Sequence, residues 1–219
     1  MNAEPIRAAL SAARTLAAFA LFITVLMAVT HQLTAPSIEA AQDRARLERI
    51  HALLDADSFD NDLLNDAIAL PPLAALGLDE PSQALRARKN GAPVAVLIEA
   101  RAPDGYGGAI DLLLAIAPDA RLLGVRVTEH HETPGLGDYI DAEKDRRTPK
   151  WIAQFDGIGL QDVPASDWLP RKDGGHFDAR TGATISARAV MRATARALEW
   201  AGAHHNELFA APDADTAHD

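Results

Sequence analysis

The sequence predicts an α+β fold in which a single N-terminal transmembrane helix precedes a domain with a small antiparallel sheet flanked by helices. Three observations predict it. Residues 15–38 contain no Asp, Glu, Lys or Arg. Three short apolar runs, at residues 94–98, 110–116 and 122–127, are separated by turn-forming residues and have the length of strands. An alanine-rich run at residues 186–200 has the spacing of a helix.

The N-terminal apolar stretch is long enough to span a membrane, because about 20 helical residues cross roughly 30 Å of hydrocarbon. We assign the span to residues 15–35 and a cytoplasmic N-terminus to residues 1–14. Arg7 and Arg14 precede the span and acidic residues follow it, beginning with Glu39, so the positive-inside rule places the rest of the chain outside the cytoplasm. A cleaved signal peptide is the alternative, but no convincing small-x-small cleavage site follows, which favours a retained anchor.

Composition excludes several functions. The formal net charge is −10 and the pI is near 5.2, which argues against nucleic acid as a partner, because phosphate binding needs clustered Lys and Arg. The chain has no cysteine, which excludes thiolate-ligated iron–sulfur clusters, cysteine zinc sites and disulfides. A redox role would therefore depend on a different cofactor.

The remaining chain divides into three parts by pattern. Residues 36–92 are expected to form a membrane-proximal helix, at residues 37–55, and then an irregular connector with short helices, because Asn, Asp, Pro and Gly recur there. Residues 93–203 are expected to form the folded domain, with a hairpin turn at residues 117–120. Residues 204–219 are expected to be a flexible acidic tail.

The first segment with chemical potential leads into the last predicted helix. Gly182 and Ala183 are small and allow a bulky group to approach the backbone, while Thr184 presents a hydroxyl near a helix N-terminus. Unpaired N–H groups and the helix dipole favour a phosphate at such a place, either bound or esterified. The plainer alternative is that Thr181, Thr184 or Ser186 caps the helix.

The second segment, residues 129–140, follows the last predicted strand. Gly135 and Gly137 permit backbone conformations that other residues resist, so a ligand can approach this loop closely. In an extended chain His130 and Glu132 point to the same side, which would be half of a metal site. We expect no bound metal, because a third ligand is not evident; a solvated polar loop is the ordinary interpretation.

Together these segments resemble the G subunit of the Rnf/Rsx-type ion-translocating electron transport complexes, and more broadly the FMN-binding domain shared with the C subunit of sodium-pumping NADH:quinone oxidoreductases. The resemblance is ordered along nearly the whole chain. It comprises the N-terminal span, the glycine-rich stretch at residues 105–108, the His-x-Glu-Thr-Pro-Gly-Leu-Gly loop at residues 130–137, Trp151 with Gln154 and Phe155, and the Thr-Gly-Ala-Thr motif at residues 181–184.

The resemblance implies a site for covalently attached FMN. In that family the last Thr of the motif is esterified to the FMN phosphate, which corresponds to Thr184 here, and the family loop often has Lys where this chain has His131. The other implied cofactor-binding residues shape the phosphate pocket or lie against the flavin: Thr181, Gly182, Ala183, Glu132, Thr133, Pro134, Gly135, Leu136 and Gly137. No catalytic acid or base is implied, because the protein holds and tunes the flavin.

The resemblance also implies partners and a role. The chain would relay electrons in a complex that couples electron transfer between ferredoxin and NAD to ion transport, with its C-terminal domain on the periplasmic side of the inner membrane, and a flavin transferase would attach FMN from FAD. Three alternatives stay open: the FMN-carrying C subunit of the sodium-pumping quinone reductase, a cofactor-free membrane-anchored periplasmic binding module, and a metal-dependent periplasmic protein. Thr181 and the compact length favour the Rnf/Rsx interpretation over the quinone reductase.

Overall fold

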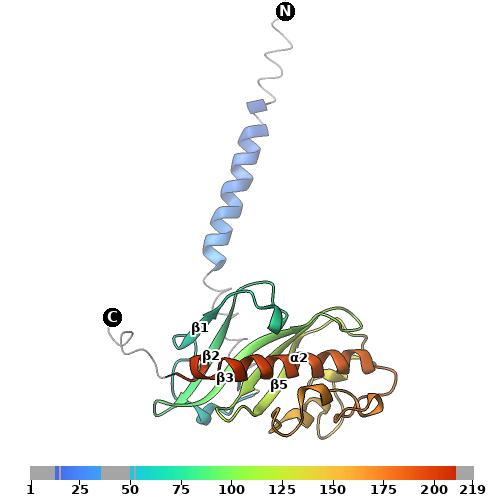
Figure 1. The fold of residues 1–219 in the computed structure, drawn as a ribbon. Helices are drawn as coiled ribbons and strands as arrows, with labels where there is room; N and C mark the ends of the chain where they lie inside the picture. The colour runs from blue at the N-terminus through green and yellow to red at the C-terminus, as the bar shows by residue number, and fades with distance from the viewer. Residues whose placement is uncertain (1–12, 15, 36–49, 52, 211–219) are drawn as a thin grey trace, which may run out of the picture. The chain divides into compact units, whose positions relative to one another are not determined.

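The computed structural model describes residues 13–14, 16–35, 50–51 and 53–210. The chain forms two compact units, Met1–Glu48 and Arg49–Asp219. The described part of the first unit includes a helix at Leu16–Ala35, which has 20 residues, a mean hydropathy of 1.9 and no buried residue in its apolar span (Figure 1). The hydroxyls of Thr24 and Thr30 donate to the carbonyls four residues earlier, so these polar groups are satisfied within the helix. By length and composition this helix can cross a membrane, in the region the sequence predicts.

The second unit is built on a five-stranded antiparallel sheet in the order β1-β2-β3-β4-β5 (Figure 1). The three predicted strands are present: β3 at Ala92–Ala102 and β5 at Leu122–Glu129 are longer than predicted, and β4 at Ile110–Ile116 has the predicted bounds. The predicted turn between β4 and β5 is also present, because the Ala120 N–H donates to the Ala117 carbonyl.

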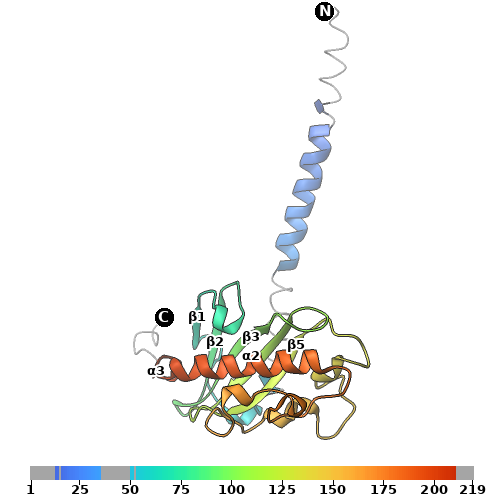
Figure 2. The same ribbon diagram turned by 45° about the vertical axis from the view of Figure 1, so that its right-hand side comes forward.

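Helix α2, Thr184–Ala203, lies across one face of the sheet (Figures 1 and 2). The helix therefore begins two residues before the predicted one and ends three residues after it. One side of each central strand packs into the core beneath α2, with Val96, Ile98 and Ala100 from β3 among its members. The alanines of α2 allow close packing of the helix on the sheet, and Ala187, Ala193 and Ala197 lie in this core. Helix α2 thus depends on the sheet for its position.

The opposite side of the sheet is also buried. Leu97 of β3 and Ala115 of β4 are fully buried on that side. The stretch that precedes β1 contributes buried Ile50, Leu54 and Leu63. Leu53 lies so close to β5 that a Cβ at Gly124 would be 2.9 Å from its side chain. Both faces of the sheet are therefore shielded, and most of the predicted helix at residues 37–55 lies outside the described residues.

Two strands lie where the sequence predicts an irregular connector. They are β1 at Ala67–Leu70 and β2 at Ser82–Lys89, so the sheet starts well before residue 93. Strand β2 carries Arg86 and Arg88, and both pair with Asp66. Arg88 is buried, since only 3% of it is exposed, and its charge hides the strand pattern in the sequence. Asp66 is thus the ionic partner of a basic strand, and this part of the predicted irregular connector belongs to the folded domain.

The C-terminal boundary also differs from the prediction at residue 204. A short helix, α3 at His205–Leu208, follows α2, and Leu208 is buried in the main core. The Arg88 guanidinium donates to the carbonyl of Ala210. Packing therefore continues to residue 210, and the rest of the predicted tail lies outside the described residues.

Short 3-10 helices connect β5 to α2. They are η3 at Asp138–Ile140, η4 at Trp151–Phe155, η5 at Ala165–Asp167 and η6 at Arg171–Asp173; two more, η1 at Ala56–Ser58 and η2 at Ala74–Leu76, flank β1. Aromatic side chains hold this connection together: Trp151 packs edge-on against Phe155, which contacts Trp168 and Phe177. This aromatic cluster is the base of the site described next.

Candidate functional site

The Thr-Gly-Ala-Thr motif forms a tight turn that leads directly into α2. The Ala183 N–H donates to the Arg180 carbonyl at 3.1 Å, which closes a β-turn. Gly182 is the third residue of this turn and has φ +88°, the left-handed value that a type II turn requires there. Helix α2 then begins at Thr184. Glycine is therefore needed at position 182 for backbone reasons alone.

The alternative interpretation of the motif as a helix cap is wrong. The N-cap position is Ala183, which has no side-chain cap hydrogen bond. Ser186 donates its hydroxyl to Glu132 instead of to the helix backbone. Because no side chain caps the helix, its first-turn N–H groups are left for another partner.

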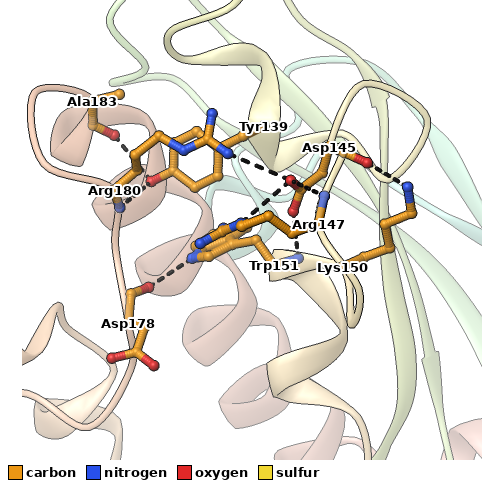
Figure 3. A network of polar contacts seen from close by, with 8 residues as sticks. All are labelled: Tyr139, Asp145, Arg147, Lys150, Trp151, Asp178, Arg180 and Ala183. Carbon is orange, nitrogen blue, oxygen red and sulfur yellow. Dashed lines mark hydrogen bonds and ion pairs between the residues drawn. The ribbon is translucent and has the colours of Figure 1, made fainter.

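Tyr139 holds the motif turn through its hydroxyl (Figure 3). Its hydroxyl accepts a hydrogen bond from the Arg180 N–H at 3.0 Å and donates one to the Ala183 carbonyl at 3.2 Å. The side chain is 1% exposed. Burial raises the pKa of the Tyr139 hydroxyl, so this hydroxyl remains a donor at neutral pH. One side chain from the second segment thus fixes both ends of the turn that presents Thr184.

A second pair of side chains fixes the chain just before the turn. The Trp151 indole donates to the Asp178 carbonyl at 2.6 Å. The Gln154 amide exchanges two hydrogen bonds with the backbone of Asp178, at 3.2 and 2.8 Å. Trp151 in turn packs edge-on against Tyr139, with 5.2 Å between ring centroids. The motif is therefore held by η3 and η4 together.

Glu132 joins three segments of the site. One of its carboxylate oxygens accepts from the Ser186 hydroxyl at 2.6 Å, and the other accepts from the Gly107 N–H at 3.1 Å. Only 5% of the residue is exposed. The loop between β3 and β4, the loop after β5 and the first turn of α2 meet at this carboxylate.

Glycines allow the three segments around Glu132 to pack this closely. A Cβ at Gly107 would lie 2.0 Å from the His131 carbonyl oxygen, closer than any side chain allows. A Cβ at Gly137 would lie 2.6 Å from a carboxylate oxygen of Glu132. The glycine-rich stretch at residues 105–108 is therefore more than a turn between strands, since its backbone packs against the loop after β5.

The residues predicted for cofactor binding lie in two groups. Glu132, Gly137, Ala183 and Thr184 are buried, with Thr184 at 7% exposure, while Thr133, Pro134, Gly135, Leu136, Thr181 and Gly182 are exposed. The groups are neighbours, because Ser186 contacts Glu132 and a Cβ at Gly182 would lie 3.9 Å from Leu136. Segments about 50 residues apart in sequence thus form one site, and His131 lies exposed beside it.

Exposed apolar side chains surround this site. Outside the N-terminal helix, four large apolar side chains are exposed among the described residues, and three of them lie on the segments that meet at Glu132. They are Tyr106, Leu136 and Ile185, which are 68%, 44% and 46% exposed. Exposed apolar groups gathered at one place indicate a surface that another molecule covers.

His130 and Glu132 do not share a site. The His130 ring accepts from the Glu132 N–H and its other nitrogen lies 3.8 Å from Asp141, whereas the Glu132 carboxylate contacts Gly107 and Ser186. Across the part of the chain that the structure describes, no group of three or more His, Asp or Glu residues could hold a metal ion.

Sequence reasoning does not reveal the role of Tyr139, the Ser186 contact or a buried carboxylate, Asp145. The Asp145 side chain has no exposed surface and accepts from the N–H groups of Trp151 and Arg147. Burial acts to raise the pKa of Asp145, but these backbone hydrogen bonds and the Arg147 guanidinium outweigh burial and lower it. No motif marks this residue; the only signal is an acid among four basic residues at 144–150.

The lowered pKa of Asp145 predicts an acid-dependent loss of stability. Its ionised form is preferred in the folded state, so its contribution is complete above the unfolded value of about 3.9 and is lost as pH falls through the lower folded value. We expect Asp145→Asn to lower the thermal unfolding midpoint at pH 7, with the difference from wild type narrowing below about pH 4. Melts of both proteins from about pH 7 to pH 3 measure this, with the exposed Glu143→Gln as control. A difference that is constant with pH would contradict the assignment.

Comparison with known proteins identifies the family. The FMN-binding domain model matches residues 105–199, and the model of the RnfG N-terminal region matches residues 1–53. The G subunit of an ion-translocating oxidoreductase complex from Pseudomonas aeruginosa is 42% identical over 98% of both chains. The chain belongs to this G-subunit family. Relatives of the same name from Shewanella loihica and Vibrio cholerae are each 40% identical, over 91% and 90% of this chain and 92% of the relatives.

These matches connect family and geometry. The FMN-binding domain match includes the loop at residues 105–108, Glu132, Tyr139 and Thr184, which are the residues that the fold brings together. The match to the Pseudomonas relative along nearly the full length covers both the candidate membrane helix and the domain. The predicted G-subunit family is therefore confirmed.

Proposed function

We propose that this chain carries FMN, esterified to Thr184, as an electron-relay subunit of an ion-translocating oxidoreductase complex that couples electron transfer between ferredoxin and NAD to ion transport. The observation that carries the proposal is the placement of Thr184. It is the first residue of an uncapped helix inside a matched FMN-binding domain, on a turn fixed by Tyr139. The relatives described above are named as G subunits of an ion-translocating oxidoreductase complex.

The residues present fit a flavin mononucleotide. A helix N-terminus without a side-chain cap favours a phosphate, and Gly182 leaves space over the backbone beside it. The Thr184 hydroxyl is not part of the hydrogen-bond network that holds the turn. Tyr106, Leu136 and Ile185 offer the apolar contacts that an isoalloxazine ring needs. FMN would supply transfer of electrons singly or in pairs, and these side chains would position it.

Attachment would need a flavin transferase that uses FAD. The Thr184 oxygen would form a bond to the FMN phosphorus, the phosphoanhydride bond of FAD would break, AMP would leave with the electron pair of that bond, and a base of the transferase would take the hydroxyl proton. We place the domain on the periplasmic side of the inner membrane, because the basic residues Arg7 and Arg14 precede the span.

Mass spectrometry of the full-length protein, co-expressed with a flavin transferase, tests the proposal. We expect an FMN-sized adduct on the peptide that contains Thr184, complete loss of the adduct in Thr184→Ala, and retention in Thr181→Ala, which changes an exposed hydroxyl in the same motif. A wild-type peptide that stays unmodified would contradict covalent attachment. An adduct that persists in Thr184→Ala would show a different acceptor.

A further inference from the structure

Positive charge gathers beside the Thr184 turn in a chain of net charge −10. Residues 144–150 contain Lys144, Arg146, Arg147 and Lys150, all exposed, and one acid, Asp145. The Asp145 carboxylate has no exposed surface; it accepts from the backbone N–H groups of Trp151 and Arg147, and the guanidinium groups of Arg147 and Arg180 lie 3.4 and 3.5 Å from it. Asp145 is thus one negative charge among several cations, so this surface stays positive.

The motif turn adds a further cation to this surface (Figure 3). The Arg180 guanidinium lies 4.5 Å from the centroid of the Tyr139 ring, and that of Arg147 lies 5.6 Å from it. Lys150 donates to the Asp145 carbonyl. We call Arg147, Lys150 and Arg180 the cationic shelf. Tyr139 connects this shelf to the turn, because it holds the backbone of Arg180 as well as its side chain.

A recess of about 490 Å³ lies beside the shelf, lined by Arg147, Thr148, Pro149, Lys150, Trp151, Ala153, Gln154 and Asp178. Its volume is within the range of small-molecule sites, roughly 300–1,000 Å³. Arg147 and Lys150 line it with positive charge, and Pro149, Trp151 and Ala153 are apolar. The acid among the lining residues, Asp178, has an ion-pair partner in Arg171 at 3.3 Å. The recess therefore suits an anion with a flat apolar body.

We propose that this recess binds the adenylate half of FAD while FMN is transferred to Thr184. The inference rests on the proposed function, because it concerns the AMP that leaves when the Thr184 oxygen attacks the FMN phosphorus. Cations placed near a leaving phosphate stabilise the charge that develops on it. The shelf also supplies local attraction for a dianionic donor that must approach a strongly acidic chain.

The lining favours a nucleotide over the acidic surface of a partner protein. An acidic protein surface would contact exposed cations on a flat face and would not need a recess. The flavin ring has a separate surface at Tyr106, Leu136 and Ile185, which reaches the motif through Glu132, whereas the shelf reaches it through Tyr139. Thr184 thus lies between two separate surfaces, one for the FMN that stays attached and one for the AMP that leaves.

Binding of AMP to the full-length protein, measured by equilibrium dialysis at low salt without flavin or transferase, is the first test. We expect AMP to bind more tightly than adenosine or inorganic phosphate, and the double variant Arg147→Gln/Lys150→Gln to weaken AMP binding at least about tenfold. The control is Lys89→Gln/Arg192→Gln, which removes the same charge elsewhere; thermal melts verify that both variants fold. If AMP and inorganic phosphate bind equally, the recess is only a general anion site and the proposal is wrong. Equal AMP affinity of the two double variants, or no binding of AMP to wild type, would also overturn the proposal.

The second test is the rate of a single round of flavin transfer from FAD. We expect the Arg147→Gln/Lys150→Gln variant to react at least about tenfold more slowly than wild type, and the control variant to react at the wild-type rate. An unchanged rate together with lost AMP binding would overturn a role in transfer. Failure of wild type to acquire FMN would instead refute the proposed function, and the AMP measurement distinguishes the two failures because it needs no flavin.

Discussion

Replacing Glu132 by alanine should lower the free energy of unfolding by about 1–3 kcal/mol, because the buried Ser186 hydroxyl loses its acceptor and the exposed Gly107 N–H loses a partner. The Gly107 N–H and the Ser186 hydroxyl both donate to this carboxylate, and the residue is 5% exposed. Each buried donor that is left without a partner costs about 1–3 kcal/mol. The change also removes a side chain that joins all three segments of the site.

Urea unfolding of the full-length protein measures this effect. The three tryptophans, Trp151, Trp168 and Trp200, all lie in the globular unit and report its unfolding. Glu132→Gln should cost less than Glu132→Ala, since one amide oxygen still accepts from Ser186 while the amide nitrogen cannot accept from Gly107. Thr133→Ala, an exposed neighbour, should leave the midpoint almost unchanged. Equal midpoints for Glu132→Ala and Thr133→Ala would show that the carboxylate does not hold the segments.

The sequence correctly predicts those helices and strands whose spacing of apolar residues can be recognised within one short stretch of the chain. The three apolar runs form β3, β4 and β5, and the alanine-rich run forms α2, because period and composition directly reflect burial on one side. Strand β2 escapes prediction although Asn90-Gly91 is a typical hairpin signal, with both residues at positive φ, and joins it to β3. Its arginines are compensated by Asp66, and such pairing is visible only in three dimensions.

The same distinction explains the site. The sequence predicts the motif and the loop after β5 as separate segments, because glycine and threonine patterns are local. Their contact through Glu132 and Ser186 joins positions 54 residues apart, and nothing in either segment specifies it. Resemblance to a family implies that both serve one cofactor, but it does not indicate which side chains connect them. Tyr139 lies in the second segment and has no predicted role, because its role is to bind the backbone of the motif turn, whose position is known only from the structure.

Tyr139→Phe should slow FMN attachment at least about tenfold, while the free energy of unfolding falls by only about 1–3 kcal/mol. The substitution keeps the ring that packs against Trp151 and lies beneath the Arg180 guanidinium, and it removes only the hydroxyl. Without that hydroxyl, the Arg180 N–H and the Ala183 carbonyl lose their shared partner, so the turn no longer holds Thr184 in one place. Displacing a reacting group by about 1 Å can cost on the order of 100-fold in rate.

The control is Ile116→Val, which removes one methylene group from the core at the far end of β4 and should cost about 0.5–1.5 kcal/mol without slowing attachment. The rates are measured at a saturating concentration of the acceptor protein and at a temperature well below its thermal unfolding midpoint. A slower rate then reflects the position of Thr184 and not a loss of folded protein. If Tyr139→Phe were slowed no more than Ile116→Val, the Tyr139 hydroxyl would contribute only to stability; a rate loss confined to Tyr139→Phe would mean that it aligns the Thr184 oxygen for attack.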